Sequence, residues 1–251
     1  MLPEYSPEDT VRAAAAAGFS AAGIWYDRDT WSASRGADVE SALRDTGLVA
    51  LDFEVVWLQP GEPDDLHDAA VATALELGAR NLLSISSEPD VAVTQRRFER
   101  LCRRAEGGDL RIVLEFMGFT EVKSLREALR VVEGVGHPAG GVLVDSLHLQ
   151  RTGGRPDDLA TIERHLLPYL QLCDATLEPP ASGPEQLLDE ALWLRALPGE
   201  GELPLAEVLD SVDPEVPVSF EVRSRALAER FPGDPVARAR AVFDAAATLP
   251  L

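Results

Sequence analysis

Two kinds of segment alternate along the whole chain, and this alternation restricts its fold more than any other feature. Short apolar runs, often β-branched, separate longer segments that are rich in Ala, Leu, Arg and Glu and have helical spacing. The first six runs recur about every 30 residues, which is the size of one βα unit. Strands that alternate with helices in this way favour a parallel sheet covered by helices. The predicted strands span residues 21–26, 48–58, 81–86, 111–117, 141–148, 169–175 and 216–222.

The segments between the runs carry helix start and stop signals. Ser6, with Asp9 three residues later, is typical of a helix N-terminus, and Gly18 is a stop signal. The last predicted strand follows a longer excursion, residues 176–214, which is rich in Pro and Gly at its two ends. The predicted helices span residues 7–17, 38–46, 65–77, 94–105, 124–135, 157–166 and 234–247.

Two parallel architectures compete for this pattern. A dinucleotide-binding doubly wound sheet would show GxGxxG after its first strand, whereas Gly134 and Gly136 precede a strand and read as a helix stop. A (β/α)8 barrel needs eight units in about 250 residues. The chain has 251 residues, but only residues 1–5 precede the first helix. We therefore predict an α/β fold in which residues 1–251 form a single (β/α)8 TIM barrel domain, with its first strand short or missing.

Charge and composition exclude several classes of partner. The 23 basic and 43 acidic residues give a net charge of −20, which disfavours nucleic acid and anionic membranes and leaves a small-molecule substrate as the expected partner. The sequence contains no apolar stretch long enough to span a membrane and does not begin like a signal peptide, so we expect a cytoplasmic protein. The preference for Ala and Arg, with Lys123 as the single lysine, is typical of a bacterial genome of high GC content and argues against Schiff-base chemistry.

Three carboxylates stand inside apolar strand segments, close to the carboxyl ends where parallel α/β folds place their chemistry. They are Glu115 in RIVLEFM, Asp145 in GVLVDSLHL and Glu221 in VPVSFEVRS. Burying a carboxylate is costly unless it is paired or bound to a cation. A shared divalent cation would satisfy all three. The alternative is three separate ion pairs with arginines on neighbouring helices.

Other polar residues are expected at the same rim. His148 follows Asp145 by three residues, and Gln171 offers an amide oxygen at the next strand end. Arg223 lies two residues after Glu221 and so points to the same side of the strand. Glu54, with Trp25 and Trp57, is a candidate for a sugar-binding wall. Arg195 lies in the excursion, where it would contact an anionic substrate or simply be a solvated helix residue.

Several ordered motifs together resemble the xylose isomerase-like TIM barrels, the sugar phosphate isomerase/epimerase superfamily. The motifs are Glu115, residues 145–148 (DSLH), residues 171–175 (QLCDA), residues 197–201 (LPGEG) and Glu221. The resemblance covers the chain from about Ser6 to the end. The superfamily includes tagatose epimerases, hydroxypyruvate isomerase, inosose dehydratase and endonuclease IV, and its members are often dimers or tetramers, which implies a homo-oligomer.

The resemblance implies roles for these residues. Divalent-metal ligands would be Glu115, Asp145, Gln171 and Glu221. By the resemblance, His148 and Arg195 would bind substrate, and Glu115 and Glu221 would also move protons. Glu54 and Arg223, from their positions in the sequence, are further candidates for substrate binding. The family usually has His at the position of Gln171. An all-oxygen site favours Mg²⁺ or Mn²⁺ over Co²⁺ or Zn²⁺.

The function expected from this site is a metal-dependent isomerase or epimerase that acts on a small keto-sugar or related polyhydroxy carbonyl compound. Proton abstraction beside the carbonyl would give an enediolate, which a Lewis acid stabilises. A lyase of the inosose dehydratase type would use the same site, and a non-catalytic barrel that binds a small ligand is a further alternative. The charge of −20 and only four histidines argue against a nuclease like endonuclease IV.

Overall fold

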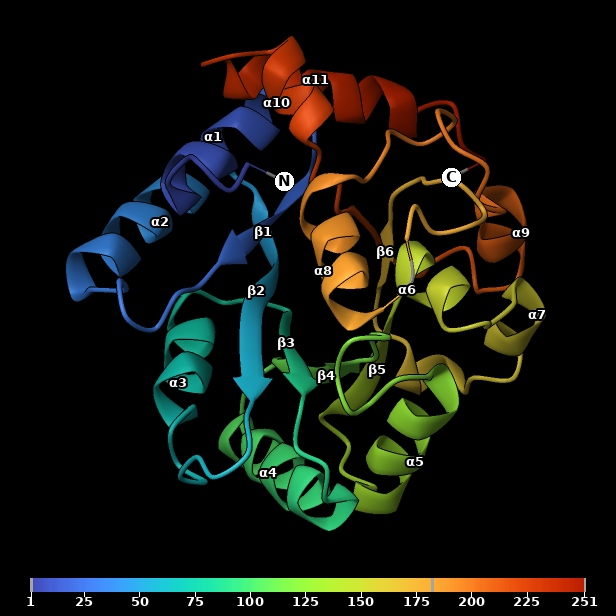
Figure 1. Ribbon diagram of the computed structural model, residues 1–251. Helices are drawn as coiled ribbons and strands as arrows, with labels where there is room; N and C mark the ends of the chain where they lie inside the picture. The colour runs from blue at the N-terminus through green and yellow to red at the C-terminus, as the bar shows by residue number, and fades with distance from the viewer. Residues whose placement is uncertain (1, 182, 251) are drawn as a thin grey trace.

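In its described residues, the protein is a parallel α/β barrel of seven strands surrounded by helices (Figure 1). This computed structural model describes residues 2–181 and 183–250, so that Met1, in the predicted leading segment, and Ser182, in the predicted excursion, lie outside the described residues. Neighbouring strands pair in chain order, and every pair is parallel. The strands are β1 (Ala21–Trp25), β2 (Val49–Leu58), β3 (Asn81–Ser86), β4 (Arg111–Glu115), β5 (Gly140–Asp145), β6 (Leu170–Leu172) and β7 (Val218–Phe220).

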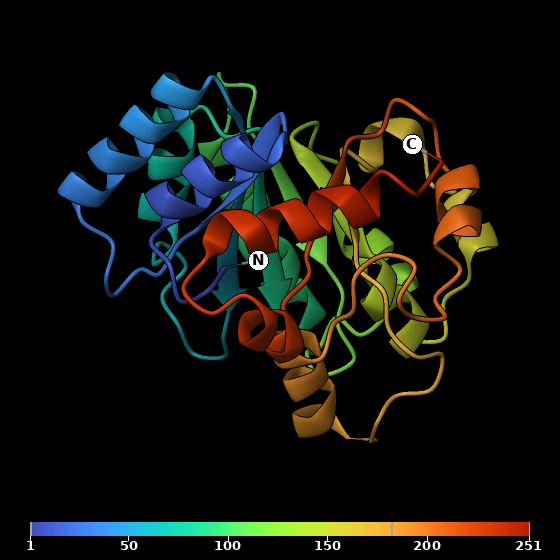
Figure 2. The ribbon, with the colours of Figure 1, turned by 90° about the horizontal axis from the view of Figure 1, so that it is seen from above.

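Helices follow the strands and form the outer layer of the barrel (Figures 1 and 2). In the described part of the chain, none of them is long and apolar enough to cross a membrane. Their bounds are α1 (Pro7–Ala17), α2 (Ala33–Thr46), α3 (Asp68–Glu76), α4 (Val91–Arg104), α5 (Leu125–Val135), α6 (Ser146–Arg151), α7 (Pro156–Leu159), α8 (Pro184–Trp193), α9 (Leu205–Asp210), α10 (Arg225–Arg230) and α11 (Pro235–Ala246), with a 3-10 turn η1 at Arg164–Leu166.

Local sequence explains where the main elements begin and end. The Ser6 hydroxyl accepts a hydrogen bond from the Asp9 backbone N–H at the start of α1, and Gly18 ends the helix at a φ of 105° that favours glycine. Strands β3 and β5 are buried along their whole length because helices cover one side and the barrel interior the other. The seven strands, and the helix that precedes them, confirm the pattern expected from the sequence.

The first strand of a complete eight-stranded barrel is missing from the described residues. Residues 2–5 form a turn before α1, and β1 and β7 are the two edges of the sheet. Helices α1 and α11 lie side by side across this seam (Figure 2). The expectation of a TIM barrel with a short or missing first strand is therefore confirmed.

Several boundaries differ from those expected. The strand expected over residues 141–148 ends at Asp145, because the Asp145 carboxylate caps α6 and turns the DSLH motif into a helix start. The helix expected over residues 157–166 is only α7 and the turn η1. The excursion contains α8 and α9, which the sequence did not predict.

The strands divide their side chains between two apolar layers. One layer lies between strands and helices and includes Leu82, Ile112, Leu114 and Val142. The other fills the barrel interior, and its members, from β3, β4, β5 and the position just before β6, are Leu83, Ile85, Val113, Leu143 and Tyr169. Successive side chains of a strand point to opposite faces, so residues two positions further along also point into the barrel.

Candidate active site

The strand alternation aims the predicted site residues into the barrel. Glu115 lies two residues after Val113, Asp145 two after Leu143 and Gln171 two after Tyr169, so each shares the face of an interior apolar residue. Glu115, Asp145 and Gln171 are each at most 1% exposed. The structure therefore brings these three together at the carboxyl ends of β4, β5 and β6, beside Glu221 at the end of β7.

Arg195 lies inside this acidic cluster. Its Nη1 atom is 2.6 Å from Oδ2 of Asp145, and its Nη2 atom is 3.0 Å from Oε2 of Glu221. The Arg195 side chain is 2% exposed, and its Nε donates to the carbonyl oxygen of Ala191 over 2.9 Å. The guanidinium thus joins acids from two strands that are not neighbours in the sheet, β5 and β7.

Asp145 also organises the start of α6. Its Oδ1 accepts hydrogen bonds from the backbone N–H groups of Leu147, at 2.7 Å, and His148, at 3.1 Å. This cap orients the first turn of the helix, and the His148 ring then lies with Nε2 4.0 Å from Oε1 of Glu115. The ring also packs edge-on against Phe119, 5.7 Å between centroids. The DSLH motif therefore places a buried imidazole beside a buried carboxyl group.

A second acidic pair comes from β2. Asp52 and Glu54 are 1% and 4% exposed, and Oε2 of Glu54 lies 3.5 Å from Nε2 of Gln171. Asp52 was not among the residues predicted for the site, although its spacing of two from Glu54 could have indicated it. Gly23 leaves room for it, since a Cβ there would lie 2.3 Å from Oδ1 of Asp52.

A pocket of about 860 Å³, its open mouth included, reaches this cluster through the seam between β1 and β7. Its walls combine apolar residues of α1, α11 and the two edge strands with three polar side chains of the site, those of Glu54, Gln171 and Glu221. The missing strand of the barrel therefore leaves a route to the acids.

Arg223 forms a different part of the site. Its guanidinium carbon lies 5.2 Å from the ring centroid of Trp25 and 5.9 Å from that of Trp193, both of them partly exposed. Its Nε has no hydrogen-bond partner among the described residues. Trp57, the other tryptophan considered for a sugar-binding wall, donates from Nε1 to the Ser87 hydroxyl at 2.9 Å.

Burial and the charges of neighbouring residues shift the pKa values of the acids in this cluster in different directions. Burial, followed by the charges of neighbouring acids, raises the pKa of Glu115 and of Glu54 well above the ordinary value. Burial also raises the pKa of Glu221, against the opposing charge of Arg195. For Asp145 burial acts upward too, but the charges of Arg195 and His148 outweigh it and the pKa is lowered. The acids therefore differ in protonation: the pKa of Asp145 favours the anion, whereas the pKa of Glu115 favours the protonated form.

The donor set in this arrangement does not fit a divalent cation. Two of the four predicted ligands, Asp145 and Glu221, are engaged by the Arg195 guanidinium. Gln171 is turned so that its amide nitrogen faces Glu54, and its Oε1 has no partner among the described residues. Within residues 2–181 and 183–250, no group of three His, Cys, Asp or Glu side chains is placed to hold a metal ion.

Asp174, which follows β6, fixes the loop that carries the LPGEG motif. Its carboxylate accepts from the backbone N–H groups of Gly199, at 2.9 Å, and Leu203, at 3.0 Å. A Cβ at Gly201 would lie 2.4 Å from Oδ1 of Asp174, so the motif glycine allows this close approach. These contacts hold the loop that follows Arg195 in the chain.

The fold and site define a class of protein: a parallel α/β barrel with buried acids at the carboxyl ends of its strands. The family described as xylose isomerase-like TIM barrel matches residues 11–245, and the chain belongs to that family.

Solved structures share the fold at low sequence identity. A xylose isomerase-like TIM barrel/4-hydroxyphenylpyruvate dioxygenase fusion protein is 21% identical with a TM-score of 0.81, covering 96% of this chain and 40% of its own. The IOLI protein with a bound zinc atom is 15% identical with a TM-score of 0.77, covering 97% and 92%. D-allulose 3-epimerase from Methylomonas sp., solved with D-allulose, is 16% identical with a TM-score of 0.73, covering 96% and 90%. The search of curated proteins gave no match.

Proposed function

We propose that this protein is an isomerase or epimerase that acts on a small polyhydroxy carbonyl compound, such as a keto-sugar, by moving a proton beside the carbonyl group. The observation that carries the proposal is the pocket whose lining includes Glu54, Gln171 and Glu221, at the strand ends of a xylose isomerase-like barrel. A D-allulose 3-epimerase among the structural relatives supports the substrate class.

The chemistry follows from the protonation states. Glu221 lines the pocket and, once ionised, removes the proton from the carbon beside the carbonyl, which leaves a negative charge on the carbonyl oxygen. Glu115 retains its proton more strongly and returns a proton to carbon, so the product has the mass of the substrate. In this proposal Arg195 and His148, which lie beside Glu221 and Glu115, supply the hydrogen-bond donors for the developing oxyanion. The residues do not fit the divalent ion expected from the sequence, and no step here depends on one.

In this proposal, recognition comes from Glu54 in the pocket and from Arg223 with its two tryptophans, which lie outside the pocket lining. Glu54 accepts or donates hydrogen bonds to substrate hydroxyl groups, and Arg223, held between Trp25 and Trp193, offers a cation to a polar or anionic end of the substrate. The two partly exposed tryptophans present flat apolar faces that suit a sugar ring.

The test is exchange of substrate protons with solvent. Small keto-sugars and related compounds are incubated with the enzyme in D2O and followed by NMR, which detects deuterium at the carbon beside the carbonyl. Glu221→Gln should reduce exchange by about 10²–10⁴-fold, the usual contribution of a general base. Glu229→Gln, the same change at an exposed position of α10, is the control and should retain full exchange.

The mass of the product then distinguishes an isomerase or epimerase from a lyase, since both reactions pass through an enolate. An isomer of equal mass supports the proposal, while a product lighter by one water shows a lyase. Full exchange in a folded Glu221→Gln variant would contradict the role of Glu221. Absence of exchange with every candidate would instead support a barrel that binds a small ligand without turnover.

A further inference from the structure

The Arg195 guanidinium lies where two carboxylates from different strands converge. Its two terminal nitrogens contact different acids, Asp145 at 2.6 Å and Glu221 at 3.0 Å. The Asp145 side chain is fully buried and the Glu221 side chain is 12% exposed. A single cation therefore bridges the acids at the ends of β5 and β7 and reduces their repulsion, which is the task that a bound metal ion would otherwise perform.

The position of Arg195 is fixed by its backbone as well as by its side chain. Antiparallel bridges lie on both sides of it, Asp174 with Ala196 and Leu194 with Ser224. Its backbone N–H donates to the carbonyl oxygen of Arg223 at 3.1 Å. The side chain adds the hydrogen bond from Nε to Ala191 and a contact of 3.3 Å between Nη1 and Sγ of Cys173. The guanidinium is thus built into the site from several directions.

The remaining predicted ligands are consistent with a resident organic cation. Oε1 of Glu115 has no hydrogen-bond partner in the described part of the chain, and the nearest cationic or ionisable nitrogen, Nε2 of His148, is 4.0 Å away. The Gln171 amide carries no charge and turns its nitrogen toward Glu54. A divalent ion needs several oxygen donors directed at one point, at about 2.0–2.6 Å. Here the two best-placed carboxylates are directed at nitrogen instead.

We propose that Arg195 is the permanent cation of this site, that it makes the site independent of divalent metal, and that its removal converts the same carboxylates into a metal site. Asp145 and Glu221 would then lose their partner, and Glu115 would supply a third carboxylate. Three carboxylates and the Gln171 amide form an oxygen donor set that suits Mn²⁺ or Mg²⁺. This inference concerns the cation alone and does not depend on the substrate or on catalysis.

The experiment measures Mn²⁺ binding to the wild-type protein and to Arg195→Met after treatment with EDTA. Equilibrium dialysis with metal analysis gives the stoichiometry, and thermal melts give the stabilisation. Wild-type protein should bind no stoichiometric Mn²⁺ and should melt at the same temperature with Mn²⁺ or EDTA. Arg195→Met should melt lower than wild type, bind about one Mn²⁺, and gain roughly 5–10 °C at saturating Mn²⁺.

Two matched variants separate position from charge. Arg195→Lys keeps a cation among the same acids and should not acquire Mn²⁺ binding. Arg223→Met removes an equal charge near Glu221 and leaves the Arg195 bridge in place, so it should also stay without stoichiometric Mn²⁺.

Several outcomes would overturn the inference. Stoichiometric Mn²⁺ binding by wild-type protein, or a melting temperature that falls with EDTA, means that metal displaces the Arg195 guanidinium from the acids. The site would then not be independent of metal. A folded Arg195→Met variant that binds no Mn²⁺ shows that Arg195 does not occupy a potential metal site. Mn²⁺ binding by Arg223→Met equal to that of Arg195→Met shows the same. If Arg195→Met folds neither alone nor with Mn²⁺, the conversion to a metal site is contradicted, and the wild-type titration decides metal independence. Loss of sugar exchange activity in the function test leaves these outcomes unchanged.

Discussion

Asp52 is a buried acid that weakens the fold when it ionises. It is 1% exposed, and no cation among the described residues neutralises its carboxylate. Burial, together with the charge of Glu221, raises the pKa of Asp52 to about 7. The folded state therefore holds this proton more tightly than the unfolded chain, in which an aspartate has a pKa of about 3.9.

This shift gives a stability prediction with a defined sign. The contribution of Asp52 is fully favourable below about pH 4 and is lost as the pH rises toward 7, because the folded state must then release the proton. Asp52→Asn removes that loss and should stabilise the protein by about 2–4 kcal/mol at pH 8, with little change at pH 4. Urea unfolding at the two pH values measures the difference. An unchanged dependence on pH in the variant would show that Asp52 is not the titrating group.

The inward direction of the site residues could be predicted from the sequence, whereas their partners could not. Glu115, Asp145 and Glu221 were expected at strand ends because an acid within an apolar parallel strand needs a partner there. Arg195 was expected on a loop or helix surface, facing a substrate. Its actual partners depend on the path of the excursion. The twenty residues up to Arg195 have no clear sequence pattern, and their path places Arg195 over the strand ends. No local signal in the sequence encodes that path.

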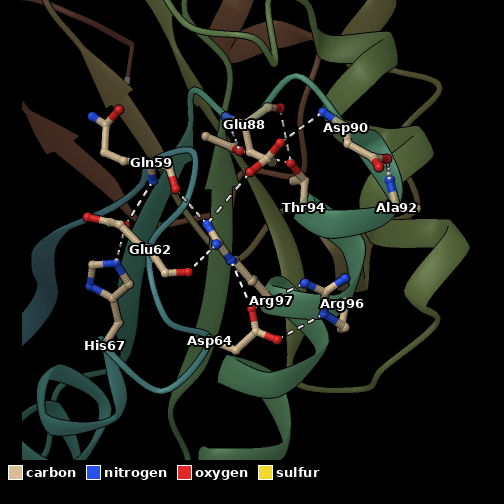
Figure 3. Close-up of polar contacts among 11 residues, drawn as sticks. Gln59, Glu62, Asp64, His67, Glu88, Asp90, Ala92, Thr94, Arg96 and Arg97 are labelled. Carbon is tan, nitrogen blue, oxygen red and sulfur yellow. Dashed lines mark hydrogen bonds and ion pairs between the residues drawn. The ribbon is translucent and has the colours of Figure 1, made fainter.

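At the scale of elements, a buried arginine of helix α4 holds the loop between β2 and α3 (Figure 3). Arg97 is 6% exposed and donates to the carbonyl oxygens of Gln59, at 2.7 Å, and Glu62, and to Oδ1 of Asp64, at 3.1 Å. Its neighbour Arg96 also contacts Asp64, at 2.9 Å, but is 56% exposed. The loop starts at the carboxyl end of β2, on the rim of the barrel beside the site.

We predict that Arg97→Met releases this loop while Arg96→Met does not. Loss of the buried arginine leaves two backbone carbonyls without their donor and Asp64 with Arg96 as its remaining partner, at a cost of roughly 2–4 kcal/mol. Hydrogen exchange should accelerate in residues 59–67 of Arg97→Met and remain at the wild-type rate in α5 and β5. The exposed arginine should contribute little, because solvent screens its ion pair. Equal exchange in the two variants would contradict the attachment.

Helices were predicted well where caps and apolar spacing agree and poorly in the excursion. Helix α1 has the predicted bounds because Ser6 and Gly18 mark its ends. Helix α8 begins at Pro184 without a side-chain cap. Its anchor is tertiary, a buried ion pair of 2.6 Å between Arg151 and Glu190. An element held by a distant partner leaves little trace in its own sequence.

At the scale of the whole molecule, helices complete the ring that the strands leave open. Strands β1 and β7 do not pair with each other in the described part of the chain, and the pocket that reaches the site runs between them. Outside it, Phe19 packs edge-on against Phe243 of α11, 5.1 Å between centroids. The guanidinium of Arg240 also donates to the carbonyl oxygen of Ala16 at 2.8 Å. These contacts join the first helix of the chain to the last, and so hold the seam and the outer wall of the pocket.

Phe243→Ala should therefore loosen the seam before it affects the rest of the barrel. Removing a large, partly buried aromatic side chain costs about 2–4 kcal/mol. Hydrogen exchange should rise first in α1, β1 and α11, while β3 and β4, at the opposite side of the sheet, stay protected until global unfolding. Phe231→Ala, a similar truncation at the end of α10, is the control and should leave α1 unchanged. A uniform loss of protection across all strands in Phe243→Ala would mean that the barrel unfolds as one unit, and that the helix pair does not close it locally.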